Sequence, residues 1–329
     1  MTYSSGGLIQ ATDYNGFVST TASANINATW GTAISGSGYG QGNVATINVA
    51  DVVSATQWST LNNRITSMGS HQGTSITART NPVAGNTIAV LSSLNTDITN
   101  CYTNRNNAAS VGTQYTGWTG TTAQTTGEGA GAWTITFTHT VTFANATALY
   151  SFFNAGGYVQ FQFGKTSTGS FADAEWNAFI GNGTSNGVVS RIVQTGAAAS
   201  KTIASTSYTG TTKFSGSGTP TTYATTVGVY ALTGTPQTIY KQFDSGTGYT
   251  SNYVQINASI SGSILTYTTT WNAADSNAGA NNLISGGSAP TGATFGTAPT
   301  TLCTYYPPET TYLSGTAWGT PTVAATVSG

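Results

Sequence analysis

The chain has 329 residues, a length that suits two or three domains, and a formal net charge of −1. Only 5% of its residues are charged, against about 25% in an ordinary soluble domain, and the few Lys and Arg residues are scattered singly. This pattern excludes the clustered cations of a nucleic-acid-binding protein, and the lack of any run of about 18 apolar residues excludes a membrane-spanning helix.

Other features of the composition indicate a folded protein with a neutral surface of hydroxyls and amides. Aromatic residues make up 11% of the chain, which argues against disorder. The first ten residues have no basic region followed by an apolar one, so we expect no secretory signal. The two cysteines, Cys101 and Cys303, are too few for a disulfide framework; we expect two buried free thiols, although the sequence leaves their pairing open.

Two similar segments near the N-terminus predict helix starts. Residues 9–17 match residues 53–61, with Tyr14 aligned to Trp58 and an apolar residue three positions further on. A threonine before the aromatic residue supplies the N-cap oxygen, and the aromatic and apolar residues share one helix face. The predicted helices run over 11–29 and 55–69.

A third helix is predicted over 86–103, with Asn86 as its cap. Apolar residues recur there at spacings of three and four: Ile88, Leu91, Leu94, Ile98 and Tyr102. The stretch is too short for a coiled coil, so we expect a helix packed on its neighbours.

From about residue 111 the sequence takes on the character of a β protein. Residues 133–143 alternate large side chains with threonine, which predicts a strand with one buried face. Short helices are predicted over 145–153 and 172–180. Further strands are predicted over 158–163, 187–194, 221–232, 237–243, 252–258 and 263–271. About the last forty residues should be irregular or extended, and no fixed-period repeat indicates a β-solenoid shaft.

The predicted fold class is therefore α+β, with an N-terminal helical module followed by a mostly antiparallel β-rich domain. We place the helical module at 1–105 and a β-rich body with short helices at 106–290. An extended Gly-, Thr- and Pro-rich C-terminal segment follows at 291–329.

The two histidines do not form a recognisable catalytic or metal site. The sequence has no HxH, HExxH or CxxC spacing. His139 shares its strand face with apolar residues, which favours a structural role. His71 follows the second helix, where a positively charged side chain would suit the helix C-terminus, and capping or local hydrogen bonding is the favoured role.

The remaining candidates for chemistry are equally poor. Asp173 and Glu175 lie two residues apart, so on a helix they point in different directions and cannot share a glycosidase cleft. Asp275 lies in a turn-like segment without the acidic residue that closes a calcium loop. The Gly-x-Ser-x-Gly pattern at 183–187 has a predicted helix before it and a predicted strand after it, which is the reverse of the order in a nucleophile elbow. The Gly-Lys-Thr at 164–166 ends like a P-loop, but Val159 stands where that motif requires its first glycine. We therefore predict no enzyme, no catalytic residue, no metal and no cofactor.

Several motifs resemble those of virion structural proteins from tailed bacteriophages, including cyanophages. They are Ile9-x-Ala-x-Asp-Tyr-Asn15, Thr29-Trp-Gly31, Gly38-Tyr-Gly-Gln41, Val53-x-Ala-Thr-Gln-Trp58, His71-Gln-Gly73, Val141-Thr-Phe143, Tyr150-x-Phe-Phe-Asn-Ala-Gly-Gly157, Tyr249-x-Ser-Asn-Tyr-Val254 and Leu265-x-Tyr-x-Thr. Together they cover most of the chain loosely. The resemblance implies a virion protein. Proteins of this group are described only as virion or tail-fibre proteins, and the resemblance implies no catalytic residues.

The functional expectation is a structural component of the virion, at the tail fibre or the baseplate periphery. A neck or capsid-surface decoration protein is the alternative within this class. A receptor- or glycan-binding adhesin, whose partner is a host cell-surface glycan, is the rival from another class. A polysaccharide depolymerase comes third.

The expected partners are other virion proteins and copies of the same chain. We expect residues 1–105 to dock onto the virion, with Tyr14, Trp58 and His71 in or directly beneath the interface. Deletion of 1–105 should leave a folded body that no longer enters particles. Because phage appendages commonly obey threefold symmetry, we also expect a homotrimer.

Overall fold

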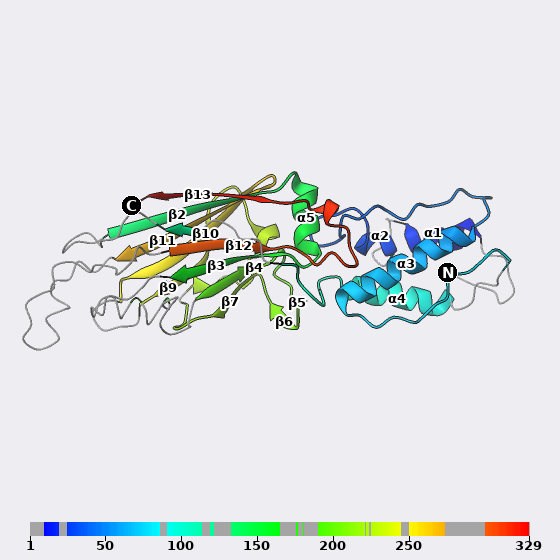
Figure 1. The fold of residues 1–329 in the computed structure, drawn as a ribbon, viewed down its shortest axis with the longest axis horizontal. Helices are drawn as coiled ribbons and strands as arrows, with labels where there is room; N and C mark the ends of the chain where they lie inside the picture. The colour runs from blue at the N-terminus through cyan, green and yellow to red at the C-terminus, as the bar shows by residue number, and fades with distance from the viewer. Residues whose placement is uncertain are drawn as a thin grey trace, which may run out of the picture.

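The computed structural model describes residues 10–19, 25–85, 91–113, 119–121, 133–164, 176, 180, 190–220, 222–223, 225–244, 250–273 and 300–328. The molecule is elongated, with helices at one end and β-sheets at the other (Figure 1). The fold is mixed α+β and mostly β, as predicted, and its sheets are antiparallel. One buried apolar cluster runs through both ends.

The predicted helix over 11–29 is wrong as one element, because the chain forms two helices there. These are α1 (Ala11–Val18) and α2 (Ile26–Thr29). The backbone leaves helical geometry at Ser19, which is extended, and α2 starts afresh at Asn25, whose side chain accepts from the Ala28 amide at 2.9 Å. An asparagine cap inside the predicted span thus marks a second helix start.

The helix predicted over 55–69 is confirmed as α3 (Ala55–Gln72), although its cap is not a threonine. Ser54 and Gln57 form a reciprocal capping box, and Gly73 ends the helix with a left-handed φ of 69°. Gln10 rather than a threonine stands at the N-cap of α1. Of the third predicted helix, the structure describes α4 (Leu91–Thr103); the rest lies outside the described residues.

The body contains two large antiparallel sheets and one small hairpin. The five-stranded sheet has the order β1 (Thr119–Thr121), β12 (Thr300–Tyr306), β3 (Tyr158–Gly164), β4 (Arg191–Gln194), β7 (Thr211–Ser215). The six-stranded sheet has the order β13 (Thr322–Ser328), β2 (Trp133–Thr142), β11 (Ile264–Ala273), β10 (Tyr253–Ser261), β9 (Gln237–Phe243), β8 (Thr222–Tyr223). β5 (Lys201–Ile203) and β6 (Thr206–Tyr208) form the hairpin.

The alternation predicted for 133–143 is confirmed in β2. Ile135, Phe137, His139 and Val141 are buried, while the threonines between them are not. The buried face meets the five-stranded sheet through aromatic rings: Phe161 lies edge-on to Tyr267 with centroids 4.8 Å apart. The two sheets therefore enclose a core of rings from alternate strand positions.

Helix α5 (Ala146–Asn154), predicted over 145–153, lies between the helices and the sheets (Figure 1). Asn145 caps it, and Gly156 follows it with a φ of 94°. Of the helix predicted over 172–180, only Trp176 and Ile180 are described; both are helical and buried.

Three predictions for the body need correction. Residues 221–232 do not form one strand, because β8 has only two residues and 229–231 form the 3-10 helix η1. The strands β5, β6 and β7 were not predicted; they have five residues or fewer, too short for a clear alternation. The last forty residues are not simply irregular, since β12 and β13 belong to the two large sheets, with the short 3-10 helix η3 (Gly315–Ala317) between them.

Candidate interaction surfaces

The three residues expected at a docking interface are all buried, and they do not form one cluster. Tyr14 and Trp58 meet edge to face with ring centroids 5.5 Å apart and are 1% and 2% exposed. The Tyr14 hydroxyl donates to the Gln57 carbonyl at 3.4 Å. His71 lies thirteen residues further along α3 than Trp58, which is about 20 Å of helix. The structure therefore brings Tyr14 and Trp58 together and leaves His71 apart.

A surface turn lies next to the Tyr14–Trp58 pair. The side-chain amide of Asn15, the neighbour of Tyr14, bonds both the carbonyl and the amide of Ile47, at 2.7 and 2.9 Å. The chain then turns between Asn48 and Asp51 before α3 begins at Ala55. We name residues 48–52 the valine turn, because Val49 and Val52 are 79% and 88% exposed. An exposed apolar pair on a fixed turn is suited to contact another protein.

His71 belongs to the junction between the helical end and the body. Its Nε2 donates to the carbonyl of Ala155, just past α5, at 3.1 Å, and its own carbonyl accepts from the Ala109 amide at 2.7 Å. Burial lowers the pKa of His71 to about 4. The lowered pKa favours the neutral imidazole at pH 7, and the hydrogen bond to Ala155 agrees with the hydrogen-bonding role favoured from the sequence.

Asn154, the last residue of α5, holds the junction together. Its Nδ2 donates to the carbonyls of Ile34, Ser37 and Gly38 at 3.0, 2.7 and 2.8 Å. Its Oδ1 accepts from the Tyr230 hydroxyl at 2.6 Å. One buried amide thus ties the loop after α2 to a residue of the body.

The buried amine of Lys201 lies at the same end of α5. Its Nζ donates to the carbonyls of Phe153 and Asn154, groups that a helix C-terminus leaves without intrahelical partners. Burial lowers the pKa of Lys201 to about 7. A lysine of β5 therefore caps α5, a contact between segments far apart in the sequence.

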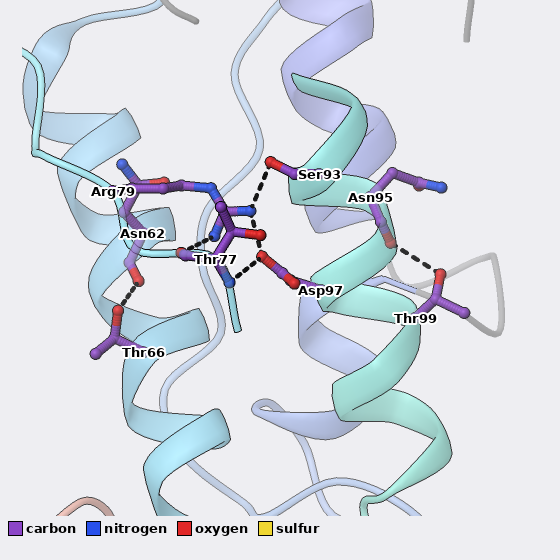
Figure 2. A network of polar contacts seen from close by, with 8 residues as sticks. All are labelled: Asn62, Thr66, Thr77, Arg79, Ser93, Asn95, Asp97 and Thr99. Carbon is purple, nitrogen blue, oxygen red and sulfur yellow. Dashed lines mark hydrogen bonds and ion pairs between the residues drawn. The ribbon is translucent and has the colours of Figure 1, made fainter. Parts of the chain in front are cut away.

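Asp97 of α4 organises the chain that follows α3 (Figure 2). Its carboxylate accepts from the Thr77 amide at 3.0 Å and from the Arg79 guanidinium, which also donates to Ser93 at 3.2 Å. The two charged side chains are only 9% and 5% exposed. The pair therefore fastens residues 77–79 to α4 rather than presenting charge to a partner.

Other basic side chains are also engaged within the chain. The Arg64 guanidinium lies 4.6 Å from the Trp30 ring centroid, and the Lys241 amine lies 3.7 Å from that of Tyr253. The Lys213 amine donates to the carbonyl of Gly218 at 2.7 Å. These cations make no cluster that would attract phosphate groups.

The outer face of the six-stranded sheet is a regular array of hydroxyls. Thr138 of β2 is paired with Thr268 on one side and with Thr326 on the other. The same face carries further threonines: Thr134, Thr136, Thr140, Thr142, Thr266, Thr270 and Thr322. We name it the threonine face. Lys241 is the only charged residue that its described strands place on it.

A row of aromatic rings lies on the outer side of the five-stranded sheet. Tyr158 stacks on Tyr306 with ring centroids 4.7 Å apart. The ring centroids of Tyr158 and Tyr208 are 5.7 Å apart, and those of Tyr208 and Phe214 are 6.0 Å apart. Tyr158 and Tyr208 are only 7% and 6% exposed. Phe214 at the end of the row is 44% exposed, so the row offers a glycan one exposed ring and little of Tyr158 and Tyr208.

The groups considered for chemistry are placed as follows. His139 is fully buried between the sheets, next to the Phe161 ring, and burial lowers its pKa to about 4. Cys101 and Cys303 are free and buried, as expected. Asp173, Glu175, Asp275, Lys165 and residues 183–187 lie outside the described residues. Within the described part of the chain, no three His, Cys, Asp or Glu side chains come together, and no helix has the length and hydropathy to cross a membrane.

Comparisons of the chain with protein-family models, with curated proteins and with solved structures found no match. The likeness to phage virion proteins therefore rests on the sequence motifs alone.

Asn154 and Lys201 were not singled out from the sequence. The only signal for Asn154 was its place in the Phe-Phe-Asn-Ala-Gly-Gly motif, where an amide at a helix end can reach neighbouring carbonyls. Lys201 carried no signal, because its partners lie some 47 residues earlier in the chain.

Proposed function

We propose that this protein is a structural component of a tailed-phage virion, at the tail fibre or baseplate periphery. The threonine face is the observation that supports this most. This outer sheet face of hydroxyls and amides has Lys241 as the one charged residue on its described strands. It can therefore lie against another protein surface with almost no cost of burying charge. Contacts made there should be largely insensitive to salt.

The helical end is proposed to dock on the particle through the valine turn. Val49 and Val52 are the exposed residues, and the turn is held on one side by the bonds from Asn15, next to Tyr14 in α1, to Ile47. On the other side it leads into α3, whose Trp58 packs on Tyr14. In this proposal Tyr14 and Trp58 support the docking surface from beneath, as expected from the sequence. His71 belongs instead to the junction between the helical end and the body. A neck or capsid-surface position would use the same contacts.

Point substitutions test docking better than deletion of 1–105. The deletion would also remove the carbonyl partners of Asn154 and part of the shared apolar cluster. We expect the variant V49D/V52D to fold and to be lost from particles assembled in its presence, because two carboxylates cannot be buried against a neutral partner.

The control is Phe214→Asp, which places a carboxylate at an exposed apolar position of β7 in the five-stranded sheet, away from both the valine turn and the threonine face. It should leave particle incorporation unchanged, as measured by quantitative mass spectrometry of purified particles. Normal incorporation of V49D/V52D would overturn docking through the valine turn, and absence of the wild-type chain from particles would overturn the virion assignment.

A further inference from the structure

The edges of the two large sheets differ in how well they are protected. Among the described residues, β1 and β8 have three and two residues. β7 carries Lys213 and lies beside a register shift between Arg191 and Ile192 of β4. Short length, lysine and bulges all discourage a further strand from adding to an edge. β13 has seven residues and none of these features.

One side of β13 is paired with β2, and among the described residues no strand is hydrogen-bonded to its other side, near which β1 of the five-stranded sheet lies. All seven of its residues pair with β2, from Thr322 opposite Thr142 to Ser328 opposite Thr136. The strand lies along the margin of the body (Figure 1), and no described strand pairs with its other side. In an antiparallel ladder half of the backbone N–H and C=O groups of an edge strand point away from its neighbour. These groups form a template for another extended chain.

The side chains of β13 make that template self-complementary. Val323 and Val327 are half-buried and pack against the core on either side of Ala325, while the alternate residues are exposed. In an antiparallel pair of two copies centred on Ala325, Val323 lies opposite Val327 of the second copy. Each inward residue then meets an apolar residue, and each outward residue meets a small or hydroxyl side chain.

We propose that β13 pairs antiparallel with β13 of a second copy of this chain about a twofold axis. The pairing joins two six-stranded sheets into one, continues the threonine face across the axis and covers the half-exposed valines. Such a twofold contact is isologous, so it closes at two copies. It differs from the homotrimer expected from the sequence, and it does not depend on the proposed place in a virion.

The test is the mass of the purified full-length protein at micromolar concentration, by sedimentation velocity or light scattering. The wild type is expected at twice 33.5 kDa. In the proposed register Ala324 lies opposite Thr326 of the second copy, and both side chains are exposed. A324K/T326K therefore places like charges opposite each other at two points, and it should be monomeric.

Two matched variants separate pairing from other effects of charge. A324K/T326E alters the same positions but places opposite charges together, so it should stay dimeric. T266K/T270K adds two lysines to the exposed face of β11, away from the edge, and it should also stay dimeric. Mixing A324K/T326K with A324E/T326E should restore a dimer that contains both chains.

Three outcomes would overturn the proposal: a monomeric wild type, a trimer, or a dimer that A324K/T326K leaves intact. Equal dissociation of A324K/T326K and A324K/T326E would do the same, because it would show that substitution rather than charge pairing is responsible. Circular dichroism of each variant establishes that the fold is kept.

Discussion

The helical end and the β body hold their chains in place by different means. In the helical end, irregular segments are fixed by side-chain amides: Asn27 donates to the carbonyls of Val18 and Val44 at 2.6 and 2.9 Å, and Asn15 holds Ile47. In the body, ladders of backbone hydrogen bonds fix the strands, and aromatic rings fill the space between sheets. Since only 5% of the residues are charged, side-chain amides and aromatic rings make most of the contacts that fix the described segments, and ion pairs make few of them.

The helical end and the β body are also joined by contacts across their junction. Asn154 and His71 reach across the junction, and the main apolar cluster includes Trp58 of α3 and Trp271 of β11. We therefore expect the two ends to unfold together despite their different construction.

The largest expected effect comes from removing one large ring at each end. Trp58→Ala and Trp271→Ala should each lower the free energy of unfolding by about 3–5 kcal/mol, because both rings are buried and leave cavities. Urea unfolding followed by fluorescence and circular dichroism should show one coincident transition in both variants. If Trp58→Ala melts the helices at lower urea while the sheets persist, the two ends are separate units.

The next effect depends on pH. Burial lowers the pKa of His71 and of His139 to about 4 in the folded protein, against about 6.5 when unfolded. Only the unfolded state takes up these protons between those values. The histidines' contribution to stability is therefore full above pH ~6.5 and falls by up to about 1.4 kcal/mol per pH unit per histidine down to pH ~4.

The variant H71Q/H139Q should flatten this slope, as measured by urea midpoints from pH 7 to 4. The single variants H71Q and H139Q would show how much of the slope comes from the histidine at the junction and how much from the histidine between the sheets. An unchanged slope in H71Q/H139Q would mean that neither histidine is held neutral.

A smaller effect is expected at the junction. Asn154→Ala removes a donor to three carbonyls and the nearer acceptor of the Tyr230 hydroxyl, and it should cost about 1–3 kcal/mol. The matched control is Asn257→Ala on the threonine face, whose amide contacts are near the surface, and it should cost less. Thermal unfolding measures both, and equal losses would contradict the special role of Asn154.

The smallest effect is expected on the threonine face. Thr138→Val keeps the shape of the side chain and removes one hydroxyl from the outer face of the sheet, where Thr138 is half-buried, so stability should change by no more than about 0.5 kcal/mol. A loss well above this value in chemical denaturation would show that the hydroxyls hold the sheet itself together, rather than forming a surface for assembly.

The sequence predicted those helices and strands that show a long regular pattern of apolar residues. The alternation of β2 and the spacing of apolar residues in α3 were sufficient for their elements. It did not predict β13, whose inward positions are two valines and an alanine, or β5 to β7, which are too short to show a period.

The candidate surfaces were predictable only in part. The matching helix starts correctly drew attention to Tyr14 and Trp58, which meet in the fold, but not to Val49 and Val52, since exposure is set by the turn that Asn15 fixes. His71 was grouped with them because its neighbours far along the chain, such as Ala155, could not be foreseen from local pattern.

The most direct test of the proposed function is a reconstruction of intact phage particles assembled from the genome in which this chain is encoded, if the proposal is right that this genome is a phage's. The account predicts density for the chain at the tail or baseplate periphery, with Val49 and Val52 against another virion protein. Particles of full mass and infectivity that contain no copy of the chain would contradict it.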